Sequence, residues 1–191
     1  MSELTPTPAE RAELVNYAPW LERVTLWQTA KGLAEPTNSV CPAELRGKTG
    51  AIFQVLLMGQ ALGIEPMQAL MQMHVIKGKV GVSAQLMRAM VLRAGHSYRF
   101  DEYSDERVVM TGRRRDGAEM TVEWDIARAS GITASDEGAK VLTDKSNWAN
   151  YPRNMLAARA TTELVRLLFP DVVAWASYTP DELGGEVVEV E

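Results

Sequence analysis

Three β-rich runs separated by short polar turns constrain the fold of this chain more than any other feature. The runs span residues 97–103, 107–112 and 118–124, and the turns between them are residues 104–106 and 113–117. Short polar turns between such runs are typical of consecutive antiparallel strands. The sequence therefore predicts a three-stranded antiparallel meander.

Two helical patterns open the chain. Thr7 and Glu10 form a capping box, which predicts a helix start, and Pro19 is expected to end or kink that helix. The next helix is predicted over residues 20–31, because its apolar residues precede Gly32, a residue type that commonly ends helices. Its two tryptophans make it a candidate subunit contact.

The segment before the meander is predicted to hold a core helix and a hairpin. Residues 51–62 carry the apolar stripe of a buried helix. Residues 73–75 and 79–82 are short strand patterns around a glycine turn, which is a hairpin signal. Ser83 can then cap a helix that Gly95 ends.

A long helix is predicted after the meander. Asp125 is expected to cap a short helix ending at Gly131, and the polar residues 131–147 are expected to form a loop. Residues 152–169 then form a helix between two prolines. The predicted fold class is α+β, with N-terminal helices, a β-hairpin plus helix, the three-stranded antiparallel meander and a long C-terminal helix.

The charge of the chain is unevenly distributed. Its net charge of −5 divides into 5 basic and 7 acidic residues over 1–70, 15 and 12 over 71–170, and 0 and 6 over 171–191. The middle segment is therefore mildly basic between acidic ends. An anionic ligand on this segment is compatible with an acidic protein, although a solvated surface explains the same charges.

Several classes of site are excluded by the residues present. Cys41 is the only cysteine, so neither an intramolecular disulfide nor a Cys/His zinc site is expected. Gly47, Lys48 and Thr49 resemble the end of a P-loop, but Pro42 stands where that motif needs a glycine. No leader pattern or membrane-length apolar run occurs, so we expect a soluble, cytoplasmic protein without membrane contact. No metal or other cofactor is expected.

Two basic turns are candidate phosphate contacts. Lys77 and Lys79 flank Gly78 at the hairpin tip, where phosphates can approach closely, although turn lysines can also be solubilising only. The three arginines at residues 113–115 are a weaker candidate, because like charges at a turn are often merely exposed.

The start of the long helix combines aromatic and basic residues. Trp148, Tyr151 and Arg153 lie near its N-terminus, where unpaired amides also favour anions, although Trp148 suits a core anchor better. Arg159 and Arg166 are seven residues apart and share one face of this helix. Phosphate binding by this face is one interpretation, and neutralisation by the intervening glutamate is the other.

Four segments, taken in chain order, resemble one known family. Residues 61–66 are similar to a GLNP or GLEP segment that follows a core helix, and a strand, turn, strand and helix come next through residues 80–83. The third segment starts at Asn147-Trp148, which is similar to a family tryptophan position. The run YPRNML at 151–156 is similar to a His-Pro-Lys-Arg-Met-Leu run, and Arg159-Ala160 is similar to the basic position that follows it. Residues 178–183 are similar to a YDKDE end. By these segments, residues 45–183 resemble the RecT/Red-beta superfamily of phage single-strand annealing proteins.

The resemblance implies a mixed α+β fold, assembly into rings or helical filaments, and ATP-independent DNA annealing without covalent chemistry, so the chain would not be an enzyme. Its partners would be single-stranded DNA, the annealed duplex and copies of itself, with a phage exonuclease or a host single-strand-binding protein as further candidates. Residues 1–44 would be a helical arm that could contact another subunit, and residues 45–183 the annealing core. Residues 184–191 would be an acidic tail where Red-beta has a further module.

The resemblance also assigns candidate DNA-binding residues. Arg153 and Arg159 match basic positions of the family and would hold phosphates, whereas Asn154 stands where Red-beta has another basic residue. Gln85 stands near an early-helix lysine of RecT. The complete candidate set is Lys77, Lys79, Gln85, Lys145, Trp148, Tyr151, Arg153, Asn154, Arg159 and Arg166.

Two other functions remain open from the sequence. Asp101, Glu102, Glu119 and Glu123 in the meander could together hold magnesium for a nuclease, although no lysine stands beside them to stabilise a leaving phosphate. The acidic tail and the apolar helices would also suit a protein that binds another protein rather than DNA.

Overall fold

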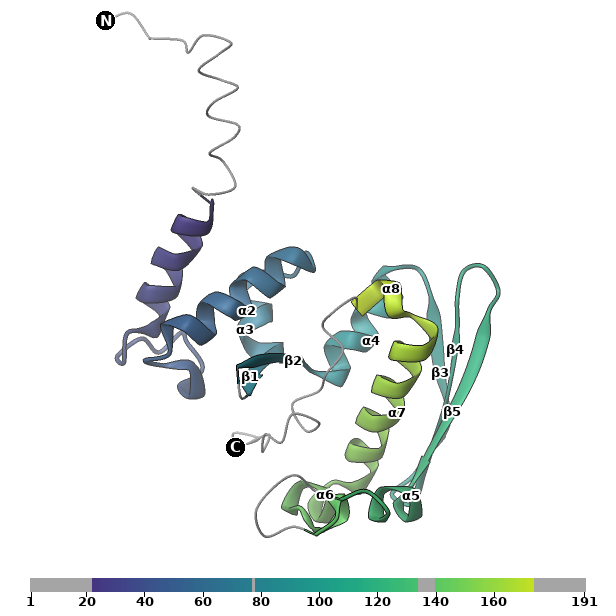
Figure 1. The fold of residues 1–191 in the computed structure, drawn as a ribbon. Helices are drawn as coiled ribbons and strands as arrows, with labels where there is room; N and C mark the ends of the chain where they lie inside the picture. The colour runs from purple at the N-terminus through teal and green to yellow at the C-terminus, as the bar shows by residue number, and fades with distance from the viewer. Residues whose placement is uncertain (1–21, 77, 134–139, 174–191) are drawn as a thin grey trace, which may run out of the picture. The chain divides into compact units, whose positions relative to one another are not determined.

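The computed structural model describes residues 22–76, 78–133 and 140–173, and the chain divides into two compact units, residues 1–70 and 71–191 (Figure 1). The helix predicted from Thr7, the hairpin residue Lys77 and the acidic tail lie outside the described residues.

A helix of the first unit covers residues 22–34. It runs through Gly32, so the predicted stop at that glycine is wrong. The helix ends where Glu35 precedes Pro36, because proline disfavours the helical conformation in the residue before it.

The predicted core helix is confirmed as α2 (Thr49–Ala61), which follows a short 3-10 turn, η1 (Ala43–Leu45). Gly63 ends it with a φ of 62°, a left-handed conformation that glycine adopts without steric cost. Trp27 packs edge to face on Phe53 of α2, with 5.1 Å between ring centroids. The helix over residues 22–34 therefore packs on α2.

The sequence pattern does not predict α3 (Pro66–Gln72), which begins at a proline. Proline fits the first turn of a helix because the N–H that it lacks would have no partner there. Gly59 of α2 lets α3 approach closely, since a Cβ at Gly59 would lie 2.7 Å from the Cβ of Ala69.

The predicted hairpin is confirmed as β1 (Met73–Ile76) and β2 (Lys79–Val82), which pair antiparallel. Gly78 takes a φ of 77° in its turn. Ser83 then caps α4 (Ala84–Arg93) as predicted, because its Oγ accepts the N–H of Leu86 at 3.1 Å.

The predicted meander is confirmed as β3 (Ser97–Tyr103), β4 (Arg107–Arg113) and β5 (Glu119–Asp125), which form an antiparallel sheet in that order. A register shift interrupts the β3–β4 pairing between Phe100 and Glu102. The shift places Tyr103 opposite Val108, on the same face as Phe100.

The segment after the sheet contains more helix than predicted. α5 (Ile126–Ser130) is the expected short helix, and Asp125 caps it by accepting the N–H of Arg128 at 2.6 Å. The predicted loop over residues 131–147 is only partly right, because η2 (Leu142–Asp144) and the start of α6 (Ser146–Asn150) lie within it. The carboxylate of Asp144 accepts two backbone N–H groups, which stabilises the turn of η2.

The long helix is confirmed as α7 (Pro152–Leu168). α7 ends just before Pro170, as predicted, but Pro170 also begins one more short helix, α8 (Pro170–Val173), which the sequence pattern does not predict. As at α3, proline is compatible with the first turn of a helix.

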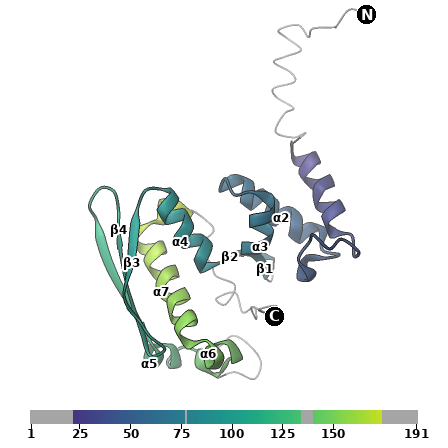
Figure 2. The ribbon, with the colours of Figure 1, turned by 180° about the vertical axis from the view of Figure 1, so that it is seen from behind.

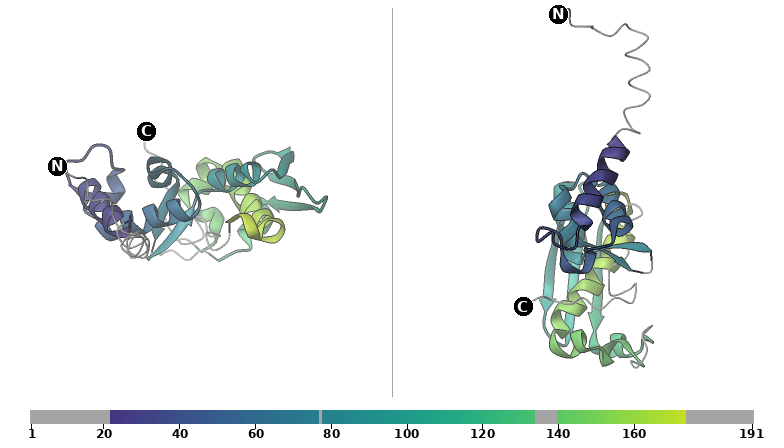
Figure 3. Two further views of the ribbon diagram at one scale, coloured as in Figure 1. Left: turned by 90° about the horizontal axis from the view of Figure 1, so that it is seen from above. Right: turned by 90° about the vertical axis from the view of Figure 1, so that its left-hand side faces the viewer.

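Two helices cover one face of the three-stranded sheet (Figure 2). α7 packs on β4 and β5, while α4 packs on β3 and on α7 (Figure 3). Gly112 of β4 leaves room for Phe169, because a Cβ there would lie 2.9 Å from its ring. The buried apolar side chains of this unit include Met87, Met90, Val108, Met110, Leu156 and Leu164.

The observed fold is α+β, as predicted, with N-terminal helices, a two-stranded hairpin, a three-stranded antiparallel sheet and a long C-terminal helix. No helix within the described ranges is long and apolar enough to cross a membrane.

Candidate nucleic-acid interface

The helices and the strands of the second unit differ in charge. The three strands of the sheet contain three arginines and five carboxylates, whereas α4 and α7 contain five arginines and one carboxylate, Glu163. The arginines of the two helices are Arg88, Arg93, Arg153, Arg159 and Arg166. Because guanidinium attracts phosphate and carboxylate repels it, the helix side of the unit is the better surface for a nucleic acid.

One row of residues crosses the sheet with an aromatic ring at each end. Tyr103, Val108 and Trp124 are cross-strand neighbours on β3, β4 and β5. An arginine of α7 lies over each ring: the Cζ of Arg153 is 5.1 Å from the ring centroid of Tyr103, and the Cζ of Arg159 is 6.0 Å from that of Trp124. The two arginines are therefore directed towards opposite edges of the sheet.

We define the Tyr103 cluster as Tyr103, Tyr151, Arg153 and Asn154. The Tyr103 hydroxyl donates a hydrogen bond to Oδ1 of Asn154 at 3.0 Å. The Nε of Arg153 lies 3.8 Å from a carboxylate oxygen of Asp105, and both side chains are more than half exposed, so this pair is weak in water. Tyr103 and Tyr151 are 46% and 49% exposed. The cluster thus offers a cation and two rings to a ligand.

The Trp124 cluster, at the other edge, consists of Trp124, Arg128, Arg159 and Glu163. Oε2 of Glu163 accepts hydrogen bonds from Nε1 of Trp124 at 2.6 Å and from Nη2 of Arg128 at 2.7 Å. The Cζ of Arg128 lies 4.0 Å from the Trp124 ring centroid. Glu163 therefore neutralises a cation of α5, a contact that the sequence does not indicate.

The other predicted DNA-binding residues lie on several elements. Lys79 is exposed on β2, and Gln85 is exposed in the first turn of α4. Lys145, between η2 and α6, and Arg166, near the end of α7, are half-buried. Lys77 lies outside the described residues. Of the predicted set, Arg153 and Asn154 share one neighbour, Tyr103.

Trp148 is buried rather than presented to solvent. Only 2% of the residue is exposed, and α6, which carries it, packs on η2 and α7. Its indole N–H has no hydrogen-bond partner within the described part of the chain. This environment matches the core-anchor interpretation of Trp148.

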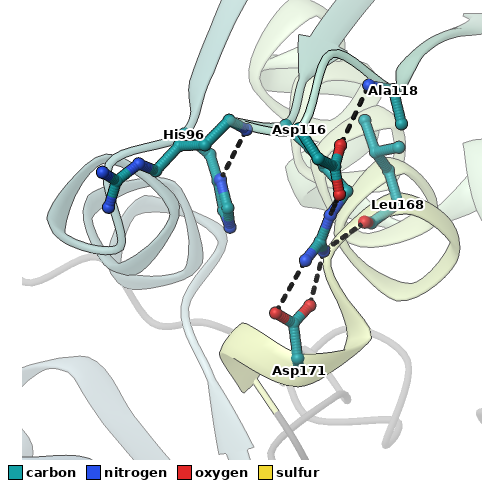
Figure 4. Close-up of polar contacts among 7 residues, drawn as sticks. His96, Asp116, Ala118, Leu168 and Asp171 are labelled. Carbon is teal, nitrogen blue, oxygen red and sulfur yellow. Dashed lines mark hydrogen bonds and ion pairs between the residues drawn. The ribbon is translucent and has the colours of Figure 1, made fainter.

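Arg114 and Arg115, at the turn between β4 and β5, form hydrogen bonds with other elements of the fold. Both terminal nitrogens of Arg114 donate to the carboxylate of Asp171, at 2.6 and 2.9 Å, and one also donates to the carbonyl of Leu168 at 2.9 Å. The backbone N–H of Arg115 donates to Nδ1 of His96 at 3.3 Å (Figure 4). These contacts attach the turn to α8 and to the residue before β3, so Arg114 has a structural role.

The Arg114–Asp171 contact gives a pH-dependent prediction. The hydrogen bonds from Arg114 lower the pKa of Asp171 from 3.8 to about 2. Because the pKa is lower in the folded chain, the contact stabilises the fold fully above pH 3.8 and ceases to do so as the pH falls through about 2. We expect Asp171→Asn to be less stable than the wild type near neutral pH, with the gap closing over this range.

Urea unfolding of the two proteins at a series of pH values measures that gap. All other titrating groups are common to the two proteins, so their contributions to the pH dependence cancel in the difference. A gap that stays constant from neutral pH to about pH 2 would contradict the assignment of the contact.

The four carboxylates considered for a nuclease lie in the sheet, and three of them pair with arginines. Asp101 pairs with Arg99 at 2.6 Å. Arg107 lies 2.8 Å from Glu123 and 3.6 Å from Glu102. Among the residues that the structure describes, no group of three or more His, Cys, Asp or Glu side chains is placed to hold a metal ion.

Sequence reasoning does not identify Tyr103 or Arg128 as part of a site. Tyr103 has the pattern of an ordinary strand residue, and its neighbours Arg153 and Asn154 follow some 50 positions later. The available signal is weak: a tyrosine at the end of a strand, next to an acidic turn.

The sequence model of the RecT family matches residues 96–191 of the chain. The matched residues include both the Tyr103 cluster and the Trp124 cluster, and they begin after the hairpin and α4. No curated protein and no solved structure matches the chain.

Proposed function

The chain belongs to the RecT family, whose members act in recombination by single-strand annealing, and we propose that it pairs complementary DNA strands without ATP. The Tyr103 cluster is the observation that carries this proposal. It places an exposed arginine over the exposed ring of Tyr103, and the exposed Tyr151 stands two residues before that arginine, all within the residues that match the family. Arginine and aromatic rings are the side chains that hold single-stranded nucleic acids in a sequence-tolerant way.

Annealing needs a surface that neutralises phosphates and leaves base edges free. Two complementary strands repel each other through their backbones, so cations on a protein surface lower the barrier to their approach. Arg153 and Arg159 supply such cations from one helix, over the two edges of the sheet. Hydrogen bonds to the backbone carry no sequence information, which suits a protein that pairs any two complementary strands.

We propose that the protein acts as an oligomer, a ring or a helical filament, with DNA bound along consecutive subunits. Linked sites raise one another's effective concentration, so each subunit needs only modest affinity. This accounts for DNA binding by a chain whose net charge is −5. The annealed duplex, and a phage exonuclease or host single-strand-binding protein, are the further partners that we propose, within the cytoplasm of a bacterial host.

The proposal is tested by annealing two complementary labelled oligonucleotides in the presence of EDTA and in the absence of ATP or any other nucleoside triphosphate. We expect the protein to accelerate pairing over a protein-free control, and to leave a non-complementary pair single-stranded. Acceleration that requires ATP or magnesium, or degradation of the labelled strand, would contradict the proposal and favour an enzyme. No DNA binding at all would favour the protein-interaction alternative.

A further inference from the structure

The Tyr103 ring is held in place from three directions. Its hydroxyl donates to Asn154 at 3.0 Å, the ring of Phe100 lies 5.2 Å away between centroids at 48°, and the guanidinium of Arg153 lies over it at 5.1 Å. Tyr103 is nevertheless 46% exposed. A ring that is both fixed and exposed can bind a flat ligand with little loss of side-chain entropy.

The guanidinium of Arg153 adds a second kind of contact at the same place. A guanidinium can stack through its planar face while its N–H groups donate from its edge, a combination that lysine cannot provide. The side chain of Arg153 is 51% exposed, and its Nε lies 3.8 Å from the exposed carboxylate of Asp105. A phosphate can therefore reach Arg153 while a flat group lies against Tyr103.

A ligand that satisfies both contacts has a planar aromatic group close to a phosphate. An unpaired nucleotide has this chemistry, because its base is free to stack on aromatic side chains. A nucleotide within a duplex offers its phosphate only, since its base is enclosed between neighbouring bases.

We propose that the Tyr103 cluster binds one unpaired nucleotide of single-stranded DNA, with its base on the surface formed by Tyr103 and Arg153 and its phosphate at the edge of Arg153. This inference rests on the proposed function and adds strand selectivity to it. Tyr103 distinguishes unpaired from paired DNA, whereas Arg153 binds the backbone of both. Release of the base on pairing then weakens this contact as the duplex forms.

The experiment compares a single-stranded oligonucleotide with one of equal length in which abasic sites replace the bases. Both carry the same phosphates, so the ratio of their dissociation constants isolates the contribution of the bases. The probes are titrated with the full chain and followed by fluorescence anisotropy. We expect the wild type to prefer the base-bearing strand by about fivefold or more.

Two variants of Tyr103 separate the ring from its hydroxyl. Tyr103→Leu is expected to reduce the preference for the base-bearing strand while leaving the salt dependence of binding unchanged. Tyr103→Phe retains the ring and is expected to retain the preference, although it loses the hydrogen bond to Asn154. It therefore controls for a purely structural effect of substitution at this position.

The possible results separate a failure of this inference from a failure of the proposed function. A wild type that binds both strands equally, or a Tyr103→Leu variant that retains the full preference, overturns the inference and leaves annealing intact. A Tyr103→Phe variant that loses the preference as fully as Tyr103→Leu overturns it as well. A wild type that binds no single-stranded DNA overturns both.

Discussion

Replacing Arg153 and Arg159 together by glutamine is expected to weaken single-stranded DNA binding by about a hundredfold. Each substitution removes one charge-assisted contact to phosphate, which costs about tenfold in affinity. The two effects should nearly add, because the arginines lie over opposite ends of the row that joins Tyr103 to Trp124. Anisotropy titrations against several unrelated sequences should show the same loss for all of them.

The salt dependence of binding separates weakened phosphate binding from a disturbed fold. The slope of log affinity against log salt should fall in magnitude by about 0.7 for each phosphate of a single strand that the variant no longer neutralises. Arg99→Gln is the matched control for each single substitution, because it also removes one positive charge. Arg99 alternates with Tyr98 and Phe100 along β3 and so faces away from the helices. A loss in Arg99→Gln equal to that in Arg153→Gln or in Arg159→Gln alone would show that net charge, not position, governs binding.

Trp148→Ala is expected to lower the free energy of unfolding by about 3–5 kcal/mol, the cost of emptying a buried tryptophan site. Trp148 is 2% exposed and lies on a short helix that packs on α7, so its removal should loosen the start of the long helix. Urea denaturation followed by far-UV circular dichroism measures this loss.

Trp148→Phe tests whether this tryptophan also contacts DNA. Phenylalanine keeps a buried aromatic ring, although a smaller one, and loses an indole N–H that has no hydrogen-bond partner among the described residues. We expect the variant to bind single-stranded DNA as tightly as the wild type while it is folded. Weaker binding at unchanged stability would place Trp148 in the interface.

Local signals in the sequence predict most elements of the second unit. Ser83 and Asp125 each precede a helical pattern, and both accept the backbone N–H expected of a cap. The first strand of the meander occupies residues 97–103, the range that its pattern predicts. Caps, turns and alternation depend on residues a few positions apart, so a single sequence contains the information.

The Tyr103 cluster depends on information that such patterns do not contain. Simple alternation from Phe100 would direct Glu102 towards the helices, and the register shift after Phe100 directs Tyr103 there instead. The contact of Tyr103 with Arg153 and Asn154 then arises from the packing of α7 on the sheet. The arginines of α7 could be proposed from the sequence, whereas their aromatic neighbours required the fold.

Short helices that begin at proline were also missed for a physical reason. Pro66 and Pro170 each follow one helix within a few residues and begin another, and proline is favourable in the first turn of a helix as well as after its end. The residue type alone does not distinguish these two positions.

The rate of annealing of two complementary oligonucleotides across a salt series, in EDTA and without ATP, tests the central claim most directly. We expect the wild type to accelerate annealing at low salt and the acceleration to fade as salt rises. We expect the Arg153→Gln/Arg159→Gln variant to lose the acceleration and Arg99→Gln to keep it. Annealing that is unaffected by salt, or equal in the wild type and the double variant, would show that phosphate binding by these arginines does not drive annealing.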